Sequence, residues 1–142
     1  MKKEVTVTIS GLHIAEDGQQ KLETVHDGEY YEKNGVHYLF FDEQQEGLAE
    51  PVRNRYTMTA DSLEVRRSGP VTAVLHFRAG ERRQNSYQVP WGNLCVESDT
   101  TRVRLDAGEN RLEMNVSYRL SLNGEEQADC DIRVCVEERK EN

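Results

Sequence analysis

Strict alternation between apolar and polar side chains constrains the fold of this chain more than any other feature. The longest alternating run covers residues 112–122, and shorter runs cover residues 128–136 and 5–10. Successive side chains of a β-strand point to opposite faces, whereas a helix would spread these apolar residues around its circumference. The pattern therefore predicts strands that each bury one face. The apolar residues of the longest run are Leu112, Met114, Val116, Tyr118, Leu120 and Leu122.

Turn signals separate the alternating runs. Asn34-Gly35 and Asn123-Gly124 are strong signals for two-residue hairpin loops, because both central residues of such a loop need positive φ angles. No segment combines a helical period with helix caps. We therefore expect strands near residues 3–11, 20–31, 36–43, 52–59, 62–68, 71–78, 85–91, 93–105, 110–122 and 127–138.

Strands that follow one another through short turns form an antiparallel meander. A long twisted sheet with one apolar face curls, and closing it on itself removes both exposed edges. We therefore predict an all-β fold, a single antiparallel up-and-down β-barrel of about 8–10 strands. No linker divides the chain, so residues 1–142 are expected to form one domain. A two-sheet sandwich is the alternative architecture.

The net charge of the chain limits the classes of molecule that it is expected to bind. It has 26 acidic and 18 basic side chains, and hence a net charge of −8. This charge argues against sequence-independent binding to nucleic acid or to anionic membranes. The arginines of residues 51–100 are expected on solvated strand faces and hairpin tips rather than gathered on one nucleic-acid-binding face. No apolar run approaches the roughly 20 residues of a membrane-spanning helix, and the first residues do not resemble a signal peptide.

Cysteine and histidine usage predicts neither a disulfide nor a metal site. Cys95, Cys130 and Cys135 are odd in number, which fits reduced thiols and a cytoplasmic location. Cys130 and Cys135 are five residues apart, so on one strand they point to opposite faces. The four histidines have no metal-ligand spacing. We expect no metal and no cofactor.

Polar residues at apolar positions of the alternation give the sharpest functional clue. Glu43 shares the face of Leu39 and Phe41, and Arg67 shares the face of Leu63 and Val65. If these faces line the barrel interior, both charges point inward near strand ends. A buried charge needs a partner, so the two residues should pair with each other, reach water at a barrel mouth, or meet a ligand. Counting along the next strands adds Tyr87 and Trp91 to the candidate ligand-binding residues.

A series of short motifs resembles the YwiB-like family of small, uncharacterised bacterial proteins. The resemblance extends from about residue 5 to residue 134 and implies a calycin-like (lipocalin-like) β-barrel. It also implies that an arginine closes one barrel end beside an aromatic side chain such as Trp91. It implies no activity. The motifs are Tyr38-Leu39-x-Phe41-x-Glu43, Val65-x-Arg67-x-Gly69, Phe77-x-x-Gly80, Tyr87-x-x-x-Trp91-Gly92-x-Leu94, Thr100 and Tyr118-x-Leu120.

The apolar positions change parity at two places. They switch from odd to even numbers at Gly92, and they return to odd numbers after Thr100-Thr101. An extra residue in one strand resets the direction of its side chains. We interpret both changes as β-bulges that curve the strand.

The sequence supports three hypotheses of function. The first is non-enzymatic binding of a small apolar or amphipathic molecule inside the barrel. The second is a protein–protein interaction module whose barrel is filled by side chains. The third and weakest is an enzyme that uses Glu43, Arg67 and Tyr87 in the barrel mouth, although no known catalytic motif is present. Interior volume separates the first two, because ligand cavities reach about 300 Å³ or more. The chain is expected to be a monomer or a homodimer.

Overall fold

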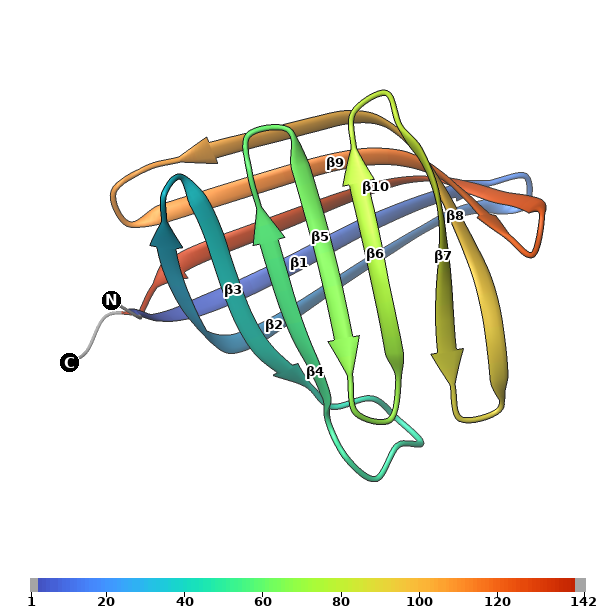
Figure 1. The fold of residues 1–142 in the computed structure, drawn as a ribbon, viewed down its shortest axis with the longest axis horizontal. Coiled ribbons are helices and arrows are strands. Elements are labelled where there is room, and N and C mark those ends of the chain that lie inside the picture. The colour runs from blue at the N-terminus through green and yellow to red at the C-terminus, as the bar shows by residue number, and fades with distance from the viewer. Residues whose placement is uncertain (1–2, 140–142) are drawn as a thin grey trace.

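The computed structural model describes residues 3–139, which form ten antiparallel strands in one closed barrel (Figure 1). The predicted barrel is confirmed, and the sandwich alternative is wrong. No helix among the described residues is long and apolar enough to cross a membrane. The strands are β1 (Lys3–Ala15), β2 (Gly18–Lys33), β3 (Val36–Glu43), β4 (Val52–Met58), β5 (Ser62–Ser68), β6 (Thr72–Arg78), β7 (Arg82–Val89), β8 (Gly92–Ala107), β9 (Arg111–Leu122) and β10 (Glu125–Glu138).

Each strand pairs with its neighbours in the sequence, and β1 closes the barrel by pairing with β10. The closing register runs from Val5 opposite Glu138 to Ile14 opposite Asp129. The predicted loops at Asn34-Gly35 and Asn123-Gly124 are confirmed. Asn34 has a φ of 53° and Asn123 a φ of 51°, in the left-handed region that two-residue hairpin loops require.

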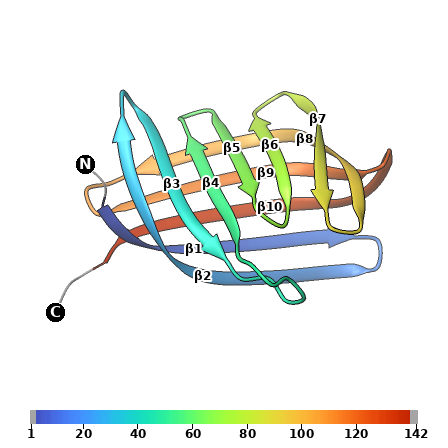
Figure 2. The ribbon, with the colours of Figure 1, turned by 60° about the horizontal axis from the view of Figure 1, so that its bottom comes forward.

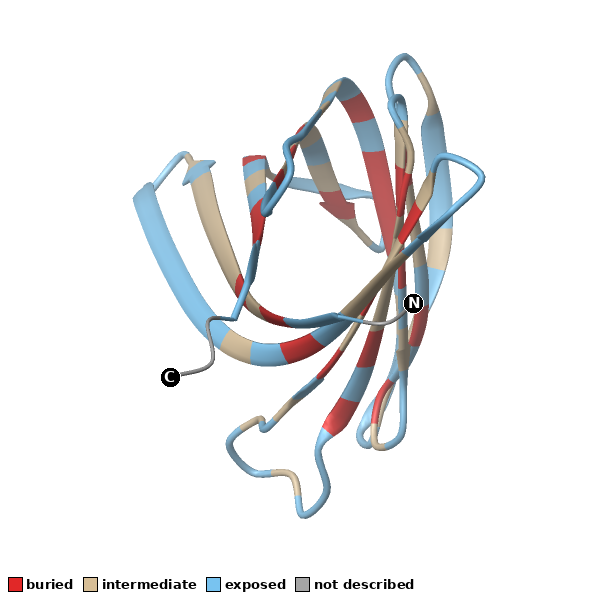
Figure 3. Cartoon of the chain, turned by 90° about the vertical axis from the view of Figure 1, so that its left-hand side faces the viewer, coloured by how far each residue is buried: buried red, intermediate tan, exposed pale blue. Residues whose placement is uncertain are grey.

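The apolar face of every long alternating run points into the barrel. Buried and exposed residues alternate along the strands, as Figure 3 shows in an end-on view. This burial of one face per strand explains why the period-two pattern was so clear. The buried core consists of Val5, Val7, Leu39, Phe41, Met58, Leu63, Val65, Phe77, Leu112, Met114, Val116, Val134 and Val136.

Strand lengths divide the barrel into two parts. The long strands β8, β9, β10, β1 and β2 cross the short strands β3 to β7. The β1–β2 and β9–β10 hairpins extend beyond the short strands at the end opposite the termini (Figures 1 and 2). β2 pairs with β1 from Gly18 to Tyr30 but with β3 only from Gly28 to Lys33. At Gly28 a Cβ atom would lie 2.7 Å from the carbonyl oxygen of Phe40, so a side chain cannot fit where β2 and β3 separate.

The two parity changes have different structural causes. A bulge lies between Thr100 and Arg102 of β8, as predicted. The bulge predicted at Gly92 is wrong, because Val89 pairs with Gly92 across a two-residue hairpin loop. Pro90 and Trp91 form that loop. Trp91 is 79% exposed and does not share the inner face with Tyr87.

The cysteines follow the prediction. Cys95 is exposed, Cys130 and Cys135 are buried, and none forms a disulfide. Cys130 lies opposite the inward-facing Tyr118, whereas Cys135 lies opposite Glu113. The last two thiols therefore point to opposite faces of β10.

Candidate functional site: a polar cluster at a cavity inside the barrel

Arg67 is the centre of a polar cluster inside the barrel. Its Nη2 atom donates to Oε1 of Glu43 at 2.7 Å, and its Nε atom donates to Oδ1 of Asn54 at 3.1 Å. Its Nη1 atom donates to the hydroxyl of Tyr87, and its guanidinium carbon lies 5.9 Å from the centre of the Tyr87 ring. The predicted inward orientation and pairing of Glu43 and Arg67 are confirmed.

The strand register explains how Arg67 reaches two strands away. Across β5, β6 and β7, Arg67 lies opposite Ala73, and Ala73 lies opposite Tyr87. Side chains in one such row share a face and are near neighbours. Because Ala73 carries only a methyl group, the space above it is left for the guanidinium group.

The cluster is largely shielded from water. The side chain of Arg67 is 14% exposed and that of Glu43 is 27% exposed. The second carboxylate oxygen of Glu43 accepts a hydrogen bond from Nε2 of Gln45 at 3.4 Å. Asn54 is buried and donates to the carbonyl oxygen of Val52 at 3.3 Å. The arginine therefore holds side chains from four strands together in one network.

An interior cavity of about 220 Å³ adjoins this cluster. Its walls come from eight strands, so it lies in the middle of the barrel. Most of the wall is apolar or aromatic, and a smaller number of polar groups interrupt it. The lining residues are Ile9, Thr24, His26, Phe41, Glu43, Tyr56, Val65, Arg67, Leu75, Phe77, Tyr118 and Ile132.

Two tyrosines bring hydroxyl groups to this cavity. Burial raises the pKa of Tyr56 to about 12; Arg67 lowers it and the nearby Glu43 raises it further. Burial also raises the pKa of Tyr118, whose hydroxyl interacts with the thiol of Cys130. Burial raises the pKa of that thiol as well. Both phenols therefore stay protonated well above neutral pH and are able to donate hydrogen bonds.

An alkaline titration should reveal the two partly buried cavity tyrosines. The pKa of Tyr56 is raised from 10.0 to about 12 on folding, so its contribution to stability is complete below pH 10 and is lost as the pH rises from 10 to 12. Ultraviolet absorbance should show Tyr56 and Tyr118 ionising after other tyrosines of the six, or only on unfolding. Six tyrosines that ionise together near pH 10 in the folded protein would contradict this.

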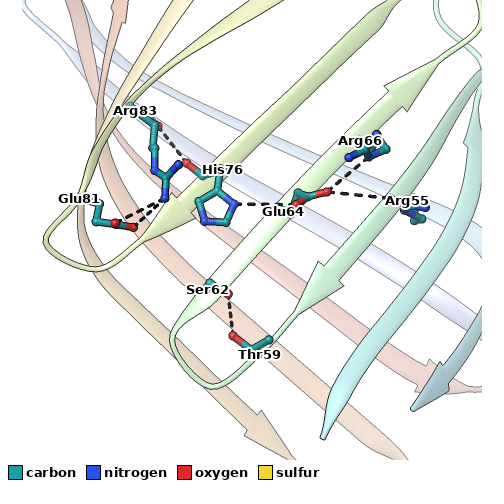
Figure 4. A network of polar contacts seen from close by, with 9 residues as sticks. Arg55, Thr59, Ser62, Glu64, Arg66, His76, Glu81 and Arg83 are labelled. Atoms are coloured by element: carbon teal, nitrogen blue, oxygen red, sulfur yellow. Dashed lines mark hydrogen bonds and ion pairs between the residues drawn. The ribbon is translucent and has the colours of Figure 1, made fainter. Parts of the chain in front are cut away.

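The arginine next to Arg67 in the sequence has the opposite environment. Arg66 points outward and lies 3.4 Å from Glu64, which also lies 4.0 Å from Arg55 and 4.0 Å from Nδ1 of His76 (Figure 4). These are exposed or half-exposed ion pairs on the outer face of β4 to β6, of the kind that contributes little to stability. Arg66 is therefore a natural control for Arg67.

The sequence prediction found three residues of the cluster but missed Asn54 of the cluster and Tyr56 of the cavity wall. Glu43, Arg67 and Tyr87 meet, whereas Trp91 lies in an exposed loop away from them. Asn54 and Tyr56 share the inward parity of Val52 and Met58 on β4, the same signal that identified Arg67.

The barrel has a second cavity, of about 300 Å³, near its two termini. There the hydroxyl of Tyr30 lies 2.6 Å from Nδ1 of the buried His37, and Glu32 lies 3.6 Å from the same nitrogen. Within residues 3–139, no three His, Cys, Asp or Glu side chains are placed to hold a metal ion. The Arg67 cluster offers hydrogen-bond donors and one carboxylate, and it contains no nucleophile paired with a base.

Comparisons with known proteins agree with this architecture. Residues 7–134 match the family model described as "Domain of unknown function (DUF1934)". The chain is 25% identical over 130 residues to the uncharacterised β-barrel protein YwiB of Bacillus subtilis (strain 168), with 89% of each protein covered. A crystal structure of the ywiB protein from Bacillus subtilis has the same fold, with a TM-score of 0.86 at 18% identity, covering 98% of this chain and 94% of that one. The chain therefore belongs to the YwiB-like family that is defined by the DUF1934 domain.

Proposed function

We propose that this protein is a non-enzymatic, calycin-like binding protein that takes one small amphipathic molecule into the interior cavity. The position of Arg67 is the main support for this proposal. Its shielded guanidinium group forms part of the wall of an otherwise mostly apolar cavity. Ligand pockets typically combine apolar walls with a few convergent polar groups, and this cavity has that composition. The free thiols support a reducing compartment, and we place the protein in the cytoplasm.

The polar groups of the cavity favour a ligand that accepts hydrogen bonds. A guanidinium group has five N–H donors, and the three bonds to Glu43, Asn54 and Tyr87 leave two of them. The hydroxyl of Tyr56, which also lines the cavity, adds a donor. Carboxylate or carbonyl oxygens suit this set, because the planar fork of arginine matches them. Phe41, Phe77 and Leu75 would surround the apolar part of the ligand.

The size of the cavity fits a small ligand, but it also fits a second function in which the barrel holds no ligand. At about 220 Å³ it lies below the roughly 300 Å³ at which cavities for drug-sized molecules begin. A barrel filled by its own side chains, acting as a protein–protein interaction module, is therefore the second candidate.

A matched pair of substitutions on β6 separates the two functions. Leu75 lines the cavity, whereas Val74 points outward on the same strand and is exposed. Leu75→Trp should fill the cavity, and Val74→Trp should leave it open. We expect the wild-type protein and Val74→Trp to retain a co-purifying small molecule in native mass spectrometry, and Leu75→Trp to lose it.

The same variants can be examined with benzoate, a compact carboxylate, as the added probe. Benzoate should shift backbone amide resonances next to Arg67 and Tyr56 in the wild-type protein and in Val74→Trp, but not in Leu75→Trp. The proposal fails if no variant retains or binds a small molecule, or if the two tryptophan variants behave alike.

A further inference from the structure

One long strand of this closed barrel has a free edge. β2 forms an uninterrupted ladder with β1 from Gly18 to Tyr30, but its pairing with β3 stops at Gly28. Among residues 3–139, no strand pairs with Gly18–Asp27 on the side away from β1. Figure 2 shows this part of β2 along the lower margin of the barrel, at the end opposite the two termini. A row of backbone N–H and C=O groups is therefore available there for another strand.

The free edge lacks several of the features that normally prevent strand pairing. Natural edges are protected by shortness, bulges, proline or charged side chains, above all lysine. Residues 18–27 contain no proline, and their ladder with β1 has no bulge. Leu22 is 56% exposed and Val25 is 63% exposed. These are two of the most exposed large apolar side chains among the described residues, and both lie on this edge.

The charges on the edge are complementary to those of a second copy in one register. Two antiparallel copies related by a twofold axis at Leu22 place Leu22 opposite Leu22. Lys21 then lies opposite Glu23 on both sides of the axis. Opposite charges in such cross-strand pairs are stabilising, and like charges are destabilising. Moving the axis by one residue brings Lys21 opposite Lys21 or Glu23 opposite Glu23, so this register is preferred over its neighbours.

We propose that the free edge of β2 pairs with the same edge of a second copy of this chain, antiparallel, with Leu22 on the twofold axis. The result is an isologous homodimer with one continuous sheet across both barrels. Leu22 lies opposite Gly11 on the inner face of the long strands, next in line to the cavity residues Thr24 and Ile9. The dimer therefore covers the apolar surface beside the cavity. Formation of this dimer does not depend on whether the cavity holds a ligand.

A charge-swap series tests the register. Sedimentation velocity over a range of protein concentrations should show a reversible dimer for the wild-type chain. Lys21→Glu places two like-charged pairs across the axis and should weaken the dimer about tenfold or more. Lys21→Glu combined with Glu23→Lys restores both pairs and should return the affinity to near the wild-type value. Lys33→Glu makes the same charge change on the part of β2 that already pairs with β3, and it should have no effect.

Cysteine cross-linking tests the position of the axis independently. Residues opposite each other in antiparallel strands have Cα atoms about 4.5–5.5 Å apart, within the range of a disulfide. In a Cys95→Ser background, Leu22→Cys should therefore form a covalent dimer under mild oxidation. Gln20→Cys should not, because the two copies of residue 20 lie about 13 Å apart along the strands.

Three experimental outcomes would each refute the proposed dimer. A protein that stays monomeric at all concentrations refutes it. So does a dimer that the charge reversal leaves unchanged, or that Gln20→Cys cross-links as well as Leu22→Cys. The circular dichroism spectrum of each variant shows whether the barrel is intact, so that loss of the dimer is not confused with unfolding.

Discussion

Replacing Arg67 with Ala is expected to lower the free energy of unfolding by about 3 kcal/mol, because it removes one partner of a shielded ion pair. The change leaves the carboxylate of Glu43 without its cation and the buried amide oxygen of Asn54 without its donor. Glu43 keeps some contact with water, which places the expected loss at the lower end of the range for buried pairs. Urea unfolding followed by circular dichroism measures the difference.

The double variant Arg67→Ala/Glu43→Ala should cost less than the sum of the two single changes, because directly paired residues are not additive. The matched control is Arg66→Ala on the outer face, where loss of a half-exposed ion pair should cost no more than about 1 kcal/mol. Strict additivity, or a loss for Arg67→Ala as small as that of the control, would show that Arg67 does not stabilise the fold and would leave ligand binding as its role.

Phe77→Ala is expected to have an effect at least as large, a loss of about 3–5 kcal/mol. Phe77 is buried, and its ring centre lies 4.7 Å from that of Tyr118 on the other side of the barrel. Its removal joins the volume of the side chain to the existing cavity, and β-barrel backbones have little freedom to collapse into such a space.

The control for Phe77 is Val74→Ala on the outward face of the same strand, which should change stability by less than about 1 kcal/mol. Both variants are compared by urea unfolding with the same slope analysis. Equal losses for the two would mean that the interior of the barrel is not packed around Phe77.

The strands were predictable wherever one face is buried. The run from Leu112 to Leu122 became β9 with an end error of one residue, because its alternation reflects burial directly. Sequence patterns are weaker where both faces meet solvent. β7 begins at Arg82, earlier than the predicted residue 85, and its first three residues are all exposed. Strand formation there follows from pairing with β8, which leaves no hydrophobic signal.

The candidate site was predictable in part. Parity placed Glu43 and Arg67 on inner faces, and the register between β3, β4 and β5 brought them together. The prediction placed Trp91 wrongly because a bulge and a hairpin loop both change the parity of the apolar positions. The sequence was interpreted as a bulge, but the structure has a hairpin loop. Pro90 and Gly92, at the second and fourth positions of a four-residue turn, were the signal for a loop.

The cavity could not be predicted from local patterns. Tyr56 on β4 and Tyr118 on β9 are far apart in the sequence, and no strand pairing links them directly. They face the same space only because of the curvature and stagger with which the barrel closes. Stagger depends on all ten strands together, and no single segment encodes it.

The pairing of β1 with β10 has a consequence for the order in which this protein can fold. Every other pairing joins strands that follow each other in the sequence, so hairpins can form through short loop closures. The closing pair brings Val5 opposite Glu138 and is the most non-local strand pairing among the described residues. Non-local pairing is slow, so a curled sheet with β1 and β10 still unjoined is the natural late intermediate. Until the barrel closes, the unpaired edges of β1 and β10 would be exposed to proteases and chaperones. This is the stage at which the molecule is most open to both.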